Sequence, residues 1–166
     1  MATYEDAMAA YAGESQANRK YQAFSEKAAQ DGFPNISRLF LAASEAEAIH
    51  AKRLLKVLNS IGTTEENLKA SVSGETHEYT EMYPAFVRDA EGEKKSDAAL
   101  AFTYAMKAEE VHAGLYKEAL KAVGSKRDLT AKKIYLCPVC GNIWHGEPPD
   151  QCPICKAFKK VFKEIA

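Results

Sequence analysis

The chain has 166 residues, 46% of them hydrophobic and 27% charged, and a formal net charge of −1. This composition is typical of a globular protein, and the absence of a basic excess argues against a nucleic-acid partner. Residues 1–15 contain no long apolar run, so we expect no secretion signal, no membrane span and a cytoplasmic location.

Four long helices are predicted, because apolar residues recur every three or four positions over most of the chain. Their expected ranges are ~3–31, ~35–61, ~64–91 and ~96–123. Thr63 and Glu66 have the spacing of a capping box that starts the third helix. Pro84 lacks an N–H group, which frees the carbonyl of Thr80, so the third helix should be kinked or locally widened there.

The last part of the chain has a different character. Residues 125–133 are polar and form a predicted linker, and residues 134–166 contain four prolines, the single tryptophan and all four cysteines. We therefore predict two domains, a helical domain over residues 1–128 and a small metal-stabilised domain over residues 134–166. About 33 residues bury too little apolar surface to fold without such help.

The cysteines form two C-x-x-C pairs separated by eleven residues. In a chain without a secretion signal, this pattern indicates metal binding rather than disulfides. Four thiolates make a tetrahedral site, which suits zinc or a single iron, and the spacing alone slightly favours zinc. The predicted ligands are Cys137, Cys140, Cys152 and Cys155.

Glutamate and histidine form a repeated pattern inside the apolar stripes of the helices. Glu-x-x-His occurs on the second and fourth helices, and a lone glutamate stands on the helix before each. A single glutamate is most simply a solvated surface residue, but buried carboxylates without partners are costly, so two matching sets predict bound cations. This is the ligand pattern of a di-metal site in a four-helix bundle, and it suits iron or manganese. The six residues are Glu14, Glu47, His50, Glu78, Glu109 and His112.

Three further residues are candidates near this site. Glu81 follows Glu78 by three residues and is a possible seventh ligand, or an exposed glutamate beside the Pro84 kink. Tyr21 and Tyr104 point toward the same interior, either as core residues or as contacts of the ligands.

Together these motifs resemble the rubrerythrin family over essentially the whole chain. The matching segments are AGESQA (12–17), EAIH (47–50), GETHEYTEMYP (74–84), EEVH (109–112), CPVCG (137–141) and CPIC (152–155). The resemblance implies a ferritin-like four-helix domain with a non-haem di-iron site, fused to a rubredoxin-like domain that binds one iron through four cysteines. Family members reduce hydrogen peroxide to water in oxidative-stress defence, and the four-cysteine iron relays electrons from a reductase or small redox carrier. That context favours iron over zinc in the tail.

The resemblance also implies roles for the ligands. Glu47 and Glu109 would bridge the two irons, Glu14 and Glu78 would each bind one of them, and His112 would be the nitrogen ligand of the second. The first iron would move between His50 and Glu81 with redox state. We take His50, Glu81 and Tyr21 as the candidate catalytic residues.

The second cysteine knuckle departs from the family pattern at one position. Lys156 replaces a glycine that usually follows the last cysteine and tends to serve a backbone with positive φ. A lysine with that backbone costs roughly 1 kcal/mol and adds positive charge beside the predicted iron.

The join between the second and third helices is short. A ferritin-like bundle needs a crossover as long as the bundle, but the three residues 62–64 span about 10 Å against helices of about 40 Å. Either the chain forms an up-down-up-down bundle, or two chains form a homodimer that exchanges helices one and two. We favour the exchanged dimer, because it keeps the ferritin-like site.

Two other functions fit parts of the sequence. A ferroxidase or iron-storage protein would use the same helical site, although storage has no need for the cysteine domain. A zinc-ribbon binding protein on a helical scaffold would explain the tail without redox chemistry.

Overall fold

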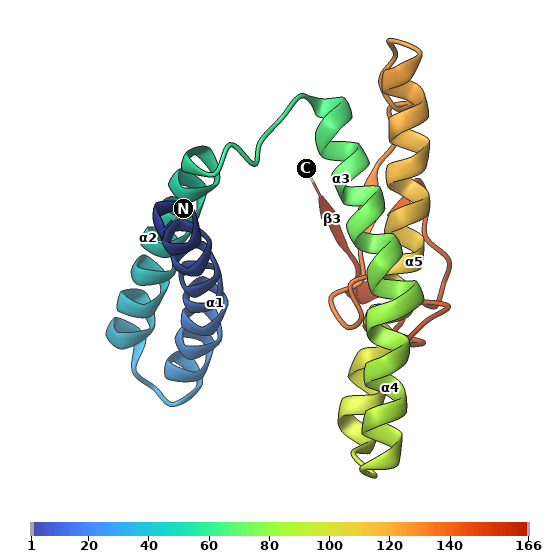
Figure 1. The fold of residues 1–166 in the computed structure, drawn as a ribbon. Helices are drawn as coiled ribbons and strands as arrows, with labels where there is room; N and C mark the ends of the chain where they lie inside the picture. Colours follow the sequence, from blue (N-terminus) through green and yellow to red (C-terminus); the bar gives the residue numbers. More distant parts are fainter. Residues whose placement is uncertain (1, 166) are drawn as a thin grey trace. The chain divides into compact units, whose positions relative to one another are not determined.

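The computed structural model describes residues 2–165 and confirms the predicted mainly helical architecture with a small C-terminal sheet and a four-cysteine knuckle (Figure 1). The chain divides after Gly62 into two compact units. The first unit contains two helices, and the second contains the remaining helices and the sheet.

The first unit is a hairpin of α1 (Ala2–Gln30) and α2 (Pro34–Val57), which lie side by side (Figure 1). Gly32 takes φ 84° in the turn and Pro34 begins α2, as expected for a helix stop followed by a helix start. Buried polar groups join the helices near their middle. The side-chain amide of Asn18 donates to the Ser44 carbonyl at 2.7 Å, and the Ser44 hydroxyl donates to the Asn18 carbonyl at 2.9 Å.

Replacing Asn18 by alanine should destabilise the helical hairpin by about 1–3 kcal/mol, because the buried Ser44 oxygens lose their donor. Thermal unfolding of the variant measures the loss. Asn35→Ala is the matched control, since Asn35 is exposed and its side-chain oxygen accepts a hydrogen bond from the exposed Arg38. Equal melting temperatures for the two variants would contradict the structural role of Asn18.

The second helix ends four residues earlier than the predicted position 61. Asn59 has φ 51°, its N–H donates to the Lys56 carbonyl, and the Ser60 N–H donates to the Leu55 carbonyl. This is a Schellman cap with asparagine in the left-handed position, so Asn59 rather than Gly62 stops the helix. The join to the next helix is consequently residues 58–63.

In the second unit, α3 (Thr64–His77), the π-helical turn η1 (Glu78–Met82) and α4 (Tyr83–Gly92) run as one rod beside α5 (Ser96–Gly124) (Figure 1). The capping box at Thr63 and Glu66 is present. The predicted widening before Pro84 is confirmed, because the Tyr83 N–H donates to the Glu78 carbonyl five residues earlier.

The tail forms a three-stranded antiparallel sheet with strand order β2-β1-β3. The strands are β1 (Ile134–Leu136), β2 (Ile143–His145) and β3 (Lys163–Ile165), and the 3-10 turn η2 (Lys159–Val161) precedes β3. Trp144 stacks on Phe162 with ring centroids 4.7 Å apart. The buried hydrophobic cluster of this domain is centred on Cys137, Cys140 and Cys152, so a bound metal would complete it.

Candidate metal centres

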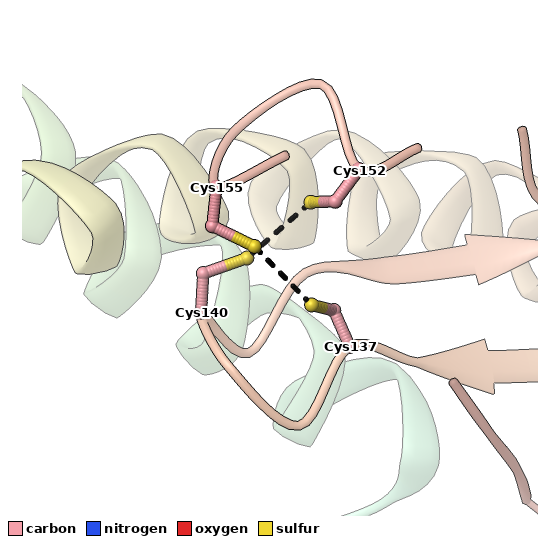
Figure 2. Close-up of side chains that lie close together, drawn as sticks. All are labelled: Cys137, Cys140, Cys152 and Cys155. Atoms are coloured by element: carbon pink, nitrogen blue, oxygen red, sulfur yellow. Dashed lines mark hydrogen bonds between the residues drawn. The ribbon is translucent and has the colours of Figure 1, made fainter. Parts of the chain in front are cut away.

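The four cysteines meet at one point between two loops. Figure 2 shows their sulfurs directed toward one another, with 3.5 Å separating Cys137 from Cys155 and Cys140 from Cys152. These distances exclude disulfides, whose sulfurs lie about 2 Å apart. They suit a tetrahedral metal instead, because bonds of about 2.3 Å place the ligand sulfurs roughly 3.8 Å apart.

Backbone hydrogen bonds repeat in the two loops. The N–H groups of Cys137 and Cys152 donate to the carbonyls of Asn142 and Ala157, both at 2.8 Å. The N–H groups of Gly141 and Lys156 donate back to the carbonyls of Cys137 and Cys152. Gly141 has φ 79° and Lys156 has φ 64°, so the lysine occupies the left-handed position expected from the sequence.

Replacing Lys156 by glycine should stabilise the metal-loaded tail by about 1 kcal/mol, because only glycine adopts this backbone without strain. The mirror variant Gly141→Ala should destabilise it by a similar amount, since a Cβ at Gly141 meets no atom within 4 Å and the cost is purely conformational. Thermal unfolding of the two loaded variants measures both effects. A lower melting temperature for Lys156→Gly would refute the prediction.

The thiol environment is suited to a cation. Burial raises the pKa of Cys140 and of Cys155. Burial also opposes ionisation of Cys152, but hydrogen bonds from the backbone N–H groups of Cys155 and Ile154, together with those from the Cys140 and Cys155 side chains, lower the pKa of that thiol. Buried thiols with N–H groups directed at sulfur are stable as thiolates once a metal neutralises them.

The first unit carries one predicted carboxylate–histidine cluster. Glu14, Glu47 and His50 offer ligand atoms that lie within 4.8 Å of one another. His50 Nδ1 is 2.9 Å from a Glu47 oxygen and 3.8 Å from a Glu14 oxygen. A hydrogen bond with Glu47 raises the pKa of Glu14, and the same bond lowers the pKa of Glu47. Two carboxylates held this close together favour a bound cation between them.

The second unit carries a cluster of Glu75, Glu109 and His112, again with ligand atoms within 4.8 Å of one another. His112 Nδ1 is 2.6 Å from a Glu109 oxygen. Glu75 Oε2 is buried and finds no hydrogen-bond partner among residues 2–165. Burial, followed by the hydrogen bond with Glu109, raises the pKa of Glu75 to about 8. An unpartnered buried carboxylate oxygen beside a histidine and a second carboxylate fits a bound metal cation.

Glu78 and Glu81 are placed differently from each other. Burial and the charge of Glu109 raise the pKa of Glu78, which places this side chain beside the second cluster. The Glu81 side chain is 72% exposed and lies 3.3 Å from the His77 ring. Both residues lie in η1.

Glu75 is not among the ligands predicted from the sequence. Chain spacing contains a signal for it. Glu75 precedes Glu109 by 34 residues (109 − 75), close to the 33 residues from Glu14 to Glu47 (47 − 14), whereas Glu78 precedes Glu109 by 31 (109 − 78). The repeat is more regular with Glu75.

The tyrosine candidates pack against apolar surroundings. Tyr21 has ring contacts with Phe24 and Phe40 at 6.2 Å, within the helical hairpin. Tyr104 of α5 packs against the buried cysteine cluster.

The helical cluster and the cysteine centre are joined by one hydrogen bond. His112 uses Nδ1 toward Glu109, and its Nε2 lies 2.9 Å from the carbonyl oxygen of Gly141, the residue that follows Cys140. A carbonyl oxygen can only accept, so Nε2 carries the proton of this contact, and Nδ1 is the nitrogen that faces the carboxylates and would bind a metal. A mainly apolar cavity of about 320 Å³ lies beside His112, between α5 and the sheet.

Comparison with known proteins identifies the family. A family model described as Rubrerythrin matches residues 8–120, and one described as "Rubrerythrin, rubredoxin-like domain" matches residues 135–163. The chain belongs to the rubrerythrin family. Rubrerythrin-2 of Clostridium acetobutylicum is 36% identical, with 93% of this chain and 91% of the relative covered. Nigerythrin of Nitratidesulfovibrio vulgaris is 37% identical, with 96% and 85% covered.

A solved structure supports the same assignment for the fold. Nigerythrin in a partially reduced state matches with a TM-score of 0.59 and 36% identity, covering 98% of this chain and 86% of that chain. As a rubrerythrin, the chain has a di-iron domain, and its four cysteines form the metal cluster of a rubredoxin-like domain. Within residues 2–165, no helix is long and apolar enough to cross a membrane.

Proposed function

We propose that this rubrerythrin is a cytoplasmic peroxidase that reduces hydrogen peroxide to water in oxidative-stress defence. The observation that supports it is the hydrogen bond between His112 and Gly141, which joins a carboxylate–histidine cluster to a four-thiolate centre. Such a connection serves electron delivery, because each turnover consumes two electrons and two protons: H2O2 + 2 e⁻ + 2 H⁺ → 2 H2O.

The proposed ligands of the iron pair come from both units. The first unit provides Glu14, Glu47 and His50, and the second provides Glu75, Glu109 and His112. The iron pair, when bound, supplies the two electrons that break the O–O bond. Glu78 lies beside the second cluster. In this proposal it replaces Glu81 as the carboxylate that binds iron in only one redox state. Glu81 can take that role only if its side chain leaves His77.

Glu78 is a candidate proton carrier in this proposal, because it lies outside the three-residue cluster and burial raises its pKa, which favours the protonated form. Tyr21 is a further candidate for holding a proton or orienting a ligand from within its aromatic contacts.

We further propose that the active protein is a homodimer that exchanges its first units. Each unit alone has an incomplete ligand set. Residues 58–63 reach roughly 20 Å when extended, whereas the 24-residue α2 is about 36 Å long. Large apolar side chains on α2 are exposed, including Leu39 at 70% and Ile49 at 57%, so this helix has surface for a second copy to cover.

The proposed reaction is tested by mixing the fully reduced, iron-loaded protein with peroxide and, separately, with dioxygen. We expect oxidation by peroxide to be much faster and to stop after reduction of stoichiometric peroxide. Faster oxidation by dioxygen with growth of an iron core would instead show a ferroxidase. A colourless preparation from anaerobic cells, with zinc in the tail and no iron, would show a zinc-binding protein.

A further inference from the structure

The two cysteine loops have the same backbone but different surroundings. The first loop contacts α5, because the Gly141 carbonyl accepts from His112. At the last cysteine the second loop is more open: Cys155 is partly exposed and Lys156 is exposed, whereas Cys140, at the matching position of the first loop, is buried. The first loop of the four-cysteine centre therefore contacts the helical cluster, and the second loop is accessible to a partner.

A basic and apolar segment continues from the accessible loop. Residues 156–163, which we call the lysine segment, contain four lysines and no acidic residue. Lys159 pairs with Glu147, but Lys156, Lys160 and Lys163 are exposed and form no ion pair with any residue of the described chain. Phe158 is 59% exposed and Val161 is 41% exposed within the same segment.

We propose that the lysine segment is the docking surface for a small acidic protein that carries one electron at a time. This inference rests on the proposed function, which requires a source of electrons. Uncompensated lysines around exposed apolar side chains match a partner with a negative surface, because charge steers the encounter and apolar contact holds it. The chain as a whole has a net charge of −1, so the attraction is local to this surface.

The position of the segment fits electron transfer. The segment begins directly after Cys155, the most exposed of the four cysteines, and Cys155 lies in the loop that does not contact His112. The reduced carrier would give up one electron, and an iron held by the four thiolates would accept it and pass from the ferric to the ferrous state. No proton is transferred in this step, and two such transfers supply one peroxide.

The Lys156 side chain also takes part in shaping this surface. Its ammonium group donates to the Pro153 carbonyl at 3.1 Å, which folds the side chain back over the second loop. The strained backbone at this position therefore places a positive charge where the partner would approach Cys155. A glycine there would remove both the charge and the strain.

The test uses flavodoxin, an acidic one-electron carrier, as the probe. The triple variant Lys156→Gln, Lys160→Gln, Lys163→Gln is compared with the matched control Lys94→Gln, Lys95→Gln, Lys121→Gln, which changes the total charge equally at exposed sites elsewhere. Glutamine leaves the backbone strain at position 156 unchanged. Reduction of the ferric four-cysteine centre by reduced flavodoxin is followed by its loss of visible absorbance at low and high salt.

We expect the triple variant to lower the second-order rate at low salt about tenfold or more, and to lose most of the salt dependence that the control retains. Affinity of oxidised flavodoxin for the oxidised protein, measured by calorimetry, should fall in parallel. Reduction by methyl viologen radical, a small cation, should not slow in the triple variant. Equal rates and affinities for the triple variant and the control would overturn the proposal.

These measurements are made without peroxide, so they separate the docking surface from the proposed reaction. If flavodoxin binding depends on the lysine segment but peroxide is not reduced, the peroxidase proposal fails and the docking surface stands. If peroxide is reduced with methyl viologen as donor, but flavodoxin reacts equally with the triple variant and the control, only the docking surface fails.

Discussion

Two inactive variants of this chain are expected to restore each other's iron site when they are produced together. One variant carries Glu47→Ala and His50→Ala in the first unit, and the other carries Glu109→Ala and His112→Ala in the second unit. In an exchanged dimer, a mixed pair has one site built from the two intact units and one site with both defects. Random pairing gives mixed dimers half of the time, so about a quarter of the sites should recover.

The measurement is the iron content and the visible absorbance of the isolated mixture, followed by its peroxide turnover. A mixture of Glu14→Ala with the Glu47→Ala, His50→Ala variant is the control, because both defects lie in the first unit and no intact site can form. If affinity tags show mixed dimers but no iron site recovers, each site is built within one chain, and the exchange is wrong.

Glu75→Gln should have opposite effects on the metal-free and metal-loaded protein. Without metal, Glu75 is a buried carboxyl beside Glu109, and its removal should raise the melting temperature by a few degrees, on the order of 1 kcal/mol. With metal, the amide lacks the negative charge that a cation requires, so iron affinity should fall by tenfold or more. Calorimetric unfolding of the apoprotein and iron titration measure the two effects.

The stability difference should also depend on pH. The folded pKa of Glu75 is raised from 4.5 to about 8, so the folded apoprotein binds more protons than the unfolded chain between these values. Its stability therefore falls as pH rises from 4.5 to 8. The Glu75→Gln variant lacks this loss, and its advantage should grow over that range and then level off.

Glu81→Gln provides the comparison that decides between two ligand assignments. The family resemblance gives Glu81 a ligand role, whereas the structure places its exposed side chain against His77 and brings Glu75 to the cluster. Loss of iron with Glu75→Gln and normal loading with Glu81→Gln would support the cluster seen here. The reverse result would show that metal binding rearranges η1.

Local chain chemistry made much of the fold predictable. The capping box at Thr63, the two cysteine loops and the widened turn before Pro84 each depend on a few neighbouring residues, and each is present. The end of α2 was predicted less well, because Gly62 and Asn59 both favour a left-handed backbone and only the hydrogen bonds of the cap decide between them.

The carboxylates of the third helix show where sequence reasoning stops. Three glutamates at positions 75, 78 and 81 share one stripe at a spacing of three, so periodicity alone does not rank them. Their side-chain directions depend on where the π turn begins, which is a property of backbone hydrogen bonds. The strained backbone and added charge of Lys156 were predictable from its place after Cys155, but the hydrogen bond from its ammonium group to the Pro153 carbonyl was not.

The π turn also rotates the side chains that follow it about the axis of the rod formed by α3, η1 and α4. A π turn holds one residue more than an α-turn, so side chains after Tyr83 are rotated by roughly 100° from where an uninterrupted α-helix would place them. Deleting a single residue from η1 would restore a regular helix. The side chains of α3 and those of α4 could then no longer both face the neighbours that they contact now. One inserted amino acid thus lets a straight rod present carboxylates to a metal over α3 and an aromatic surface, Tyr83 and Phe86 against Phe102, over α4. Deleting this extra residue of η1 would therefore test the carboxylates of α3 and the aromatic surface of α4 in one variant.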